Sequence, residues 1–303
     1  MENEISSQNI PTVDDTGPGS LIIPNETRDP DFSVPISQTG ILYNNMLKAL
    51  ENRDELTIAT MGMTGNGKST LINSLPGYFA HSSFNVAYNS NELIQPIKYS
   101  THVGQSDTIF SKTYIFRSPN GKKLRLIDMP GFGDTGGEQM DRIHSDTILN
   151  ALANVGHIDV VLFVFKSDDT TSTKEFRYVM EKQVENYSKD FVKHFAFCFT
   201  FGNSRSFDIK KAKRAVQSVF DEWRSDDIHI QLTDENCFLV DNMPFGTLMK
   251  RSQLADHFTN EKCWEHSVAA WCRLLLYAST LGPIKTTNIR SISDANKRID
   301  LRC

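Results

Sequence analysis

Residues 62 to 69 read Gly-Met-Thr-Gly-Asn-Gly-Lys-Ser and fit the pattern G-x-x-x-x-G-K-[ST] at every position. Backbone N–H groups that turn inward around an anion need residues that tolerate unusual dihedral angles, as glycine does. The lysine of such a loop reaches the β- and γ-phosphates of a nucleotide, and the hydroxyl of its last residue binds Mg²⁺. The pattern predicts a nucleotide-phosphate site made of Gly62, Met63, Thr64, Gly65, Asn66, Gly67, Lys68, Ser69, Thr70 and, further along the chain, Gly131.

A second candidate lies in the stretch Leu-Arg-Leu-Ile-Asp-Met-Pro-Gly, which runs from residue 124 to residue 131. In P-loop NTPases an acid in this position holds Mg²⁺. The glycine three residues later leaves a backbone N–H group that can sense the γ-phosphate. We therefore predict that Ser69 and Asp128 bind the metal, and the D-x-x-G spacing favours a GTPase-type switch over a generic ATPase.

The elements that must position these residues follow from apolar periodicity. Near-continuous apolar runs indicate strands that are covered on both faces, and apolar residues spaced three or four apart indicate helices. Strands that alternate with helices favour an α/β fold around a largely parallel sheet. We predict strands at 56–61, 123–127, 158–165, 195–200 and 237–240, and helices at 41–50, 68–75, 138–155, 172–187, 208–223 and 261–277.

Composition excludes several classes of protein. Among the 303 residues, 39% are hydrophobic, enough for a sizeable core, yet no apolar run reaches the ~18–20 residues of a membrane span. A net charge of −5 argues against a nucleic-acid partner. The five cysteines are scattered without a C-x-x-C pair, and no H-E-x-x-H motif occurs, so neither a disulfide framework nor a side-chain metal cage is expected. These features favour a cytoplasmic protein.

The chain divides into three predicted regions. Residues 1–38 hold five of the eleven prolines, seven acidic residues and one basic residue, Arg28. This composition is typical of an acidic disordered tail. A P-loop domain with a lead-in helix is expected at 39–282, followed by a C-terminal tail at 283–303.

The segments GMTGNGKSTLINSL and LIDMPGFGDT together resemble the septin-related GTPases, especially the IMAP family of immunity-associated GTPases. The chloroplast import-receptor GTPases are relatives of that family. The resemblance covers roughly residues 56 to 245. It implies a P-loop NTPase of the GTPase-type three-layer fold with a mostly parallel six-stranded central sheet. It also implies Mg²⁺-dependent binding of GTP and GDP, slow GTP hydrolysis, and a homodimer through the nucleotide face.

The resemblance also implies a switch threonine about twenty residues before Asp128, which would bind Mg²⁺ in the triphosphate state. Thr108 fits that spacing, and Thr101 is the alternative. Many GTPases have a glutamine directly after D-x-x-G that orients the attacking water. Here that residue is Phe132, which cannot do so, and the catalytic group remains unidentified in the sequence.

Guanine recognition usually depends on an N/T-K-x-D box after the fifth strand. Here Thr200 occupies the first place, Phe201 replaces the lysine and Asn203 replaces the aspartate. An amide presents one acceptor oxygen where a carboxylate presents two. Asn242, after the sixth strand, is a further candidate for base contact. For both asparagines, loop capping is the alternative role.

Two other functions compete with a GTP-hydrolysing switch. A non-catalytic scaffold would bind nucleotide only to stabilise an assembly surface. An ATP-dependent P-loop enzyme is disfavoured by the placement of the D-x-x-G motif.

Overall fold

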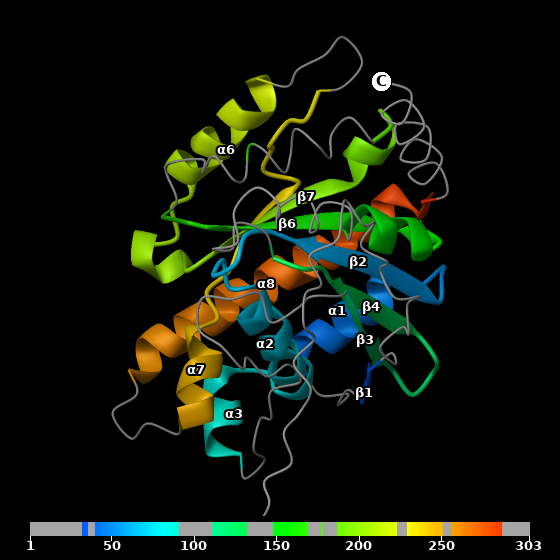
Figure 1. Ribbon diagram of the computed structural model, residues 1–303. Helices are drawn as coiled ribbons and strands as arrows, with labels where there is room; N and C mark the ends of the chain where they lie inside the picture. The colour runs from blue at the N-terminus through cyan, green and yellow to red at the C-terminus, as the bar shows by residue number, and fades with distance from the viewer. Residues whose placement is uncertain are drawn as a thin grey trace, which may run out of the picture. The chain divides into compact units, whose positions relative to one another are not determined.

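The computed structural model describes residues 32–35, 40–90, 111–131, 148–168, 177, 187–222, 229–250 and 256–286. Contacts divide the chain into two units, Met1–Pro30 and Asp31–Cys303, and every described residue belongs to the second. Strands and helices alternate along this unit (Figure 1).

The centre of the fold is a seven-stranded sheet in which only the β3–β4 pair is antiparallel. The predicted α/β class with a mostly parallel sheet is therefore confirmed. Six neighbouring strands form the predicted sheet, and β1 adds a seventh at its edge. In spatial order the strands are β1 (Phe32–Pro35), β3 (Lys112–Arg117), β4 (Lys123–Asp128), β2 (Glu55–Met61), β6 (Val160–Lys166), β7 (Phe195–Thr200) and β8 (Cys237–Leu239).

Two strands lie outside the range 39–282 that the sequence predicts for the domain. The backbone of β1 pairs in parallel with β3, although its residues fall in the predicted tail. At the other end, β9 (Ile284–Lys285) pairs with β5 (His157–Ile158) in a separate two-stranded sheet. Both pairings are non-local and leave little trace in local composition. We therefore propose that the folded domain runs past both predicted limits.

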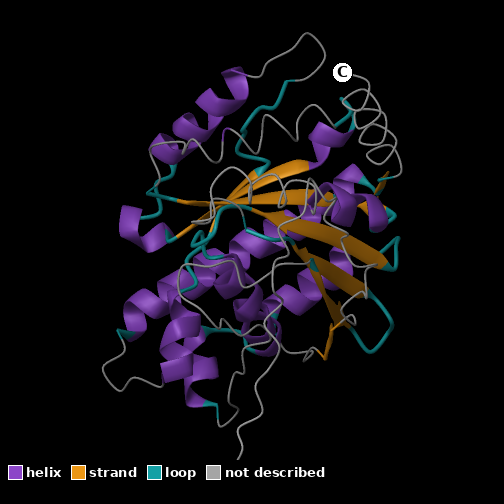
Figure 2. Ribbon diagram, viewed as in Figure 1, coloured by secondary structure: helices purple, strands orange, loops and turns teal. Residues whose placement is uncertain are grey.

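Helices cover both faces of the sheet (Figure 2). On one face, Leu56 and Ile58 of β2 share a core with the first, second and last helices. On the other face, Ala59 and Met61 pack with α6 and with the helical residues 148–154. The helices are α1 (Ile41–Ala49), α2 (Lys68–Ala80), α3 (Phe84–Asn89), α6 (Lys210–Glu222), α7 (Met243–Lys250) and α8 (His257–Leu281).

Helix α2 continues past the predicted end at Leu75, and the prediction of a helix ending there is wrong. Pro76 lies inside the helix and removes one backbone hydrogen bond, a change that costs about 3 kcal/mol. Beyond it, Tyr78 and Phe79 are fully buried in the core. Each large apolar side chain contributes ~1.5–3 kcal/mol when buried, so the last turn is stabilised by packing despite the proline.

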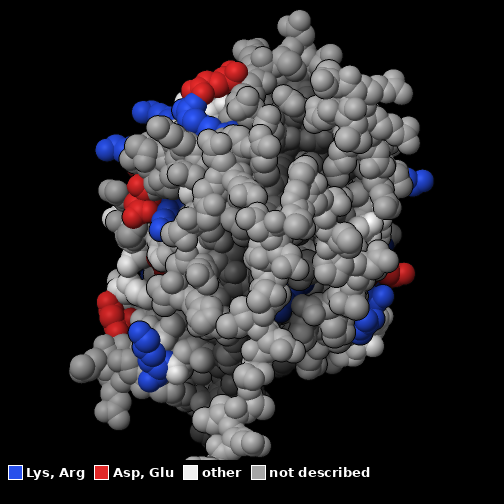
Figure 3. Space-filling model, viewed as in Figure 1, with Lys and Arg blue, Asp and Glu red and all other residues white. Residues whose placement is uncertain are grey.

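The described surface carries charges of both signs. In Figure 3, blue and red side chains lie close together over the part of the view where Figure 1 places α6. Lys213 of this helix pairs with Asp234 at 2.7 Å, and Glu222 at its end pairs with Arg177. Of the basic residues that begin α6, Lys210, Lys211, Lys213 and Arg214, Lys213 thus has an acidic partner, as on a solvated helix face. None of the described helices is long and apolar enough to cross a membrane.

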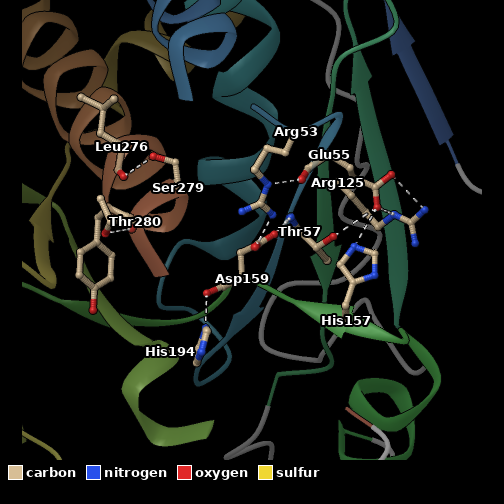
Figure 4. Close-up of polar contacts among 11 residues, drawn as sticks. Arg53, Glu55, Thr57, Arg125, His157, Asp159, His194, Leu276, Ser279 and Thr280 are labelled. Carbon is tan, nitrogen blue, oxygen red and sulfur yellow. Dashed lines mark hydrogen bonds and ion pairs between the residues drawn. The ribbon is translucent and has the colours of Figure 1, made fainter. Parts of the chain in front are cut away.

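The edge of the sheet where β2 begins holds a partly buried ion pair (Figure 4). The carboxylate of Asp159, which is fully buried, pairs with Arg53 and accepts a 2.7 Å hydrogen bond from the backbone N–H of Thr57. The backbone oxygen of Asp159 lies 2.8 Å from Nδ1 of His194. This contact network joins the start of β2 to the start of β6.

We expect Asp159→Ala to lower the free energy of unfolding by about 2–4 kcal/mol, because it leaves the partly buried guanidinium of Arg53 without its carboxylate and the buried N–H of Thr57 without its acceptor. Urea denaturation would measure the loss. Lys193→Ala is the control, since Lys193 and Asp190 form an exposed ion pair that should contribute nothing measurable. If the Asp159→Ala protein were as stable as this control, the Arg53–Asp159 pair would not contribute to stability as proposed.

Candidate functional site: a phosphate loop at the carboxyl edge of the sheet

The predicted phosphate loop connects β2 to α2. Gly67 adopts a φ of 86°, a left-handed conformation that favours glycine, and the helix begins at the next residue. The first N–H groups of a helix have no intrahelical acceptor, so this helix start can bind an anion. The strand, loop and helix therefore follow one another as the sequence predicts.

Side chains from neighbouring strands hold the loop in place. The amide Nδ2 of Asn66 donates to the backbone oxygen of Val164 on β6 at 2.8 Å. The hydroxyl of Thr200, at the end of β7, lies 2.8 Å from the backbone oxygen of Asn66 and 3.0 Å from that of Phe165. All of these contacts are buried. Thr200, predicted to contact guanine, therefore uses its hydroxyl to brace the phosphate loop.

Lys68 points back across the loop. Its Nζ donates to the backbone oxygens of Gly62 at 2.6 Å and Met63 at 3.0 Å, and the side chain is buried. A second ammonium group, that of Lys166 at the end of β6, lies 4.0 Å from the point where a Cβ on Gly65 would stand. Lys166 is not among the predicted site residues, although a lysine at the end of a buried apolar run is a usable signal. Two cations thus lie beside the loop.

Asp128 and Gly131 meet the loop from the neighbouring strand. Asp128 is fully buried at the end of β4 and pairs in register with Thr60, close to the end of β2. A Cβ on Gly131 would stand 2.6 Å from Oγ1 of Thr64 and 3.1 Å from Nζ of Lys68. A larger residue at this position would force the side chains of Thr64 and Lys68 to shift. The two predicted motifs are therefore brought together, as a phosphate-sensing site requires.

The donor set suits a magnesium ion. Ser69, the second residue of α2, is partly exposed, and Asp128 supplies a carboxylate from the adjacent strand. Within the described residues, no group of three or more His, Cys, Asp or Glu side chains could hold a metal by itself. Mg²⁺ binds through one or two carboxylates together with substrate phosphates and water, so such a cage is not needed.

The four described cysteines are free. Burial raises the pKa of Cys198 to about 12, so it remains a thiol at neutral pH. Its side chain packs in the core with Leu162 and Val164 of the neighbouring strand β6.

The loop after β7 is tied to the loop after β8. Phe201 has a φ of 56° and a side chain that is 45% exposed. The backbone N–H of Asn203 donates to Oδ2 of Asp241 at 2.8 Å, while Oδ1 of the same carboxylate accepts from the N–H of Met243 at 2.9 Å. Asp241, which the sequence analysis did not single out, thus fixes both loops of the predicted base site.

The two candidate asparagines differ in their surroundings. Asn242 is buried, and its Oδ1 accepts a 3.0 Å hydrogen bond from the hydroxyl of Tyr78 on α2. Burial raises the pKa of Tyr78 well above its usual value, so this hydroxyl remains a donor. Asn203 is partly exposed, and its side chain makes no hydrogen bond to the described residues. Asn203 is the better placed of the two to contact a ligand.

Other predicted residues lie outside the described part of the chain. Thr108 and its alternative Thr101 fall in the segment 91–110, and Phe132 begins the segment 132–147.

Fold and site together define a P-loop NTPase of the GTPase type. A sequence model of the AIG1 family matches residues 56–208, and the chain belongs to that family. The family resemblance of the two phosphate motifs is thus confirmed.

The chain is also similar to a curated GTP-binding protein and to solved structures of a GTPase. GTP-binding protein A of Dictyostelium discoideum is 30% identical over 159 residues, which cover 52% of this chain but 30% of the relative. Toc33 from Arabidopsis thaliana has a similar fold. Its structure in complex with Mg²⁺ and GMPPNP matches with a TM-score of 0.52 and 15% identity over 79% of this chain and 91% of Toc33. A dimerization-deficient Toc33 mutant matches with the same TM-score and 14% identity.

The two asparagines should respond differently to truncation. We expect Asn242→Ala to lower the free energy of unfolding by about 1–3 kcal/mol, because the buried Tyr78 hydroxyl loses its acceptor. Asn203→Ala should change stability by less than about 0.5 kcal/mol, because its backbone N–H still donates to Asp241. Denaturant unfolding without nucleotide measures both values. Equal losses in the two variants would contradict these roles.

Proposed function

We propose that this chain binds GTP and GDP together with Mg²⁺ and hydrolyses GTP slowly as a nucleotide-dependent switch. The observation that carries the proposal is the convergence of Gly131 with Thr64 and Lys68. This convergence supports a role for the D-x-x-G glycine beside the γ-phosphate, because it brings Gly131 next to the lysine that would bind that phosphate. Loss of that phosphate would then remove the contact made by Gly131 and release the segment that follows β4.

Family membership supports guanine as the base. The Dictyostelium relative is named a GTP-binding protein, and Toc33 structures contain GMPPNP or GDP with Mg²⁺. In this chain we propose that Asn203 and the exposed face of Phe201 contact the base. The carboxylate of Asp241 would hold their loop in position. Asn242 would contribute through the N–H₂ of its side-chain amide, because its Oδ1 already accepts a hydrogen bond from Tyr78.

The Mg²⁺ ion would be held by the hydroxyl of Ser69 and the carboxylate of Asp128. Thr108 is proposed as a third protein ligand in the triphosphate state. When bound, the ion neutralises charge on the β- and γ-phosphates during phosphoryl transfer. The protein itself contributes Lys68 and the inward N–H groups of the loop, which orient the phosphates.

Lys68→Ala tests the phosphate site. We expect the affinity for labelled GTP to fall by about ten-fold to more than a hundred-fold, because a charge-assisted contact worth ~1.5–3 kcal/mol is lost. Fluorescence titration measures this, with the surface variant Lys193→Ala as the control. Unchanged GTP binding by Lys68→Ala would overturn the assignment of this loop.

Turnover tests the proposed self-association. Since Phe132 stands where many GTPases have a water-orienting glutamine, the isolated chain lacks that group at this position. We propose a homodimer through the nucleotide face, in which a second copy completes the site. Hydrolysis per molecule should therefore rise from nanomolar to micromolar protein.

A flat turnover rate across that concentration range would exclude self-activation. Tight binding without turnover at any concentration would favour a non-catalytic scaffold, the alternative that the missing glutamine supports. Preference for ATP would favour an ATP-dependent enzyme. We further propose a cytoplasmic location and no nucleic-acid partner, in keeping with the net charge of −5.

A further inference from the structure

The hydroxyl of Thr64 is an unused hydrogen-bonding group at the centre of the phosphate loop. Its Oγ1 is buried and has no hydrogen-bond partner among the described residues. A buried hydroxyl that lacks a partner is destabilising, so such groups call for a ligand or a functional explanation.

The loop does not need this hydroxyl to keep its shape. Asn66 and Thr200 fasten the loop to β6 and β7 through buried hydrogen bonds. The side chain of Lys68 holds the two ends of the loop together by donating hydrogen bonds to the backbone oxygens of Gly62 and Met63. Thr64 takes no part in these contacts. Its hydroxyl is therefore held in a preformed loop without supporting it.

The position of the hydroxyl indicates what it would bind. Gly131 has no Cβ, but one placed on its backbone would lie 2.6 Å from Oγ1 of Thr64 and 3.1 Å from Nζ of Lys68. A lysine in this place reaches the β- and γ-phosphates. The hydroxyl of Thr64 thus faces the D-x-x-G glycine, whose backbone N–H is expected to sense the γ-phosphate, and lies near the ammonium group of Lys68.

We propose that the Thr64 hydroxyl binds the terminal phosphate of a nucleoside triphosphate by donating a hydrogen bond to one of its oxygens. A diphosphate ends before this point and leaves the hydroxyl without a partner. The phosphate loop itself would then distinguish the triphosphate from the diphosphate. This inference rests on the proposed nucleotide function and adds a residue that discriminates between its two ligand states.

The test is calorimetric titration of the full chain with GDP and with a non-hydrolysable GTP analogue, each with Mg²⁺. Thr64→Val keeps the shape of the side chain and removes the hydroxyl. We expect its affinity for the GTP analogue to fall by about ten-fold, as for one charge-assisted hydrogen bond, while its affinity for GDP changes by less than about two-fold. Thr64→Ser should restore the affinity for the analogue.

Two controls separate this role from a structural one. Thr200→Val removes a hydroxyl that braces the loop, so it should weaken both nucleotides alike. Thermal unfolding without nucleotide should show Thr64→Val to be at least as stable as the parent, because an unsatisfied buried hydroxyl is removed. A lower melting temperature would mean that the hydroxyl has a structural partner, and would overturn the proposal.

Equal weakening of GDP and GTP analogue by Thr64→Val, or no weakening of either, would also overturn the role of Thr64 while leaving the nucleotide function intact. Failure of the parent chain to bind either nucleotide would instead overturn the proposed function itself.

Discussion

The parallel alignment of β4, β2, β6 and β7 is the constraint on which the site depends. Because these four neighbouring strands run in the same direction, their carboxyl ends meet at one edge of the sheet. Asp128, the phosphate loop, Lys166 and Thr200 follow or end these strands, and so they come together although the sequence separates them. Binding at this edge is the general rule for open α/β sheets. The opposite edge carries the Arg53–Asp159 pair, which joins β2 to the start of β6 and so helps to fix their alignment.

Polar side chains at the carboxyl edge serve two different purposes. Those of Asn66, Thr200 and Asp241 are buried and bonded to backbone groups, so they hold loops in position. Thr64 and Asn203 have side chains without hydrogen bonds to the described residues, and they are the ones that we propose contact the nucleotide. A loop that is rigid before the ligand arrives loses little conformational entropy on binding.

Local patterns predicted much of this fold, because glycine spacing and apolar periodicity are properties of short segments. The phosphate loop, the central strands and helix α1 are where the sequence places them. Three features escaped prediction because they depend on distant partners. Strands β1 and β9 are formed by non-local pairing, helix α2 passes Pro76 because Tyr78 and Phe79 are buried, and Thr200 faces the phosphate loop because β7 ends beside it. Asp241 was missed for the same reason, since only the fold brings it to Asn203.

The central claim is that this edge of the sheet binds a guanine nucleotide together with Mg²⁺. Calorimetric titration of the purified chain with GDP and with ADP, each in Mg²⁺ and in EDTA, tests it most directly. The account predicts saturable binding of GDP that weakens when Mg²⁺ is removed, and binding of ADP that is at least about ten-fold weaker, the effect of one or more unmet hydrogen bonds to the base. Equal affinity for the two nucleotides, or no binding of GDP, would contradict it.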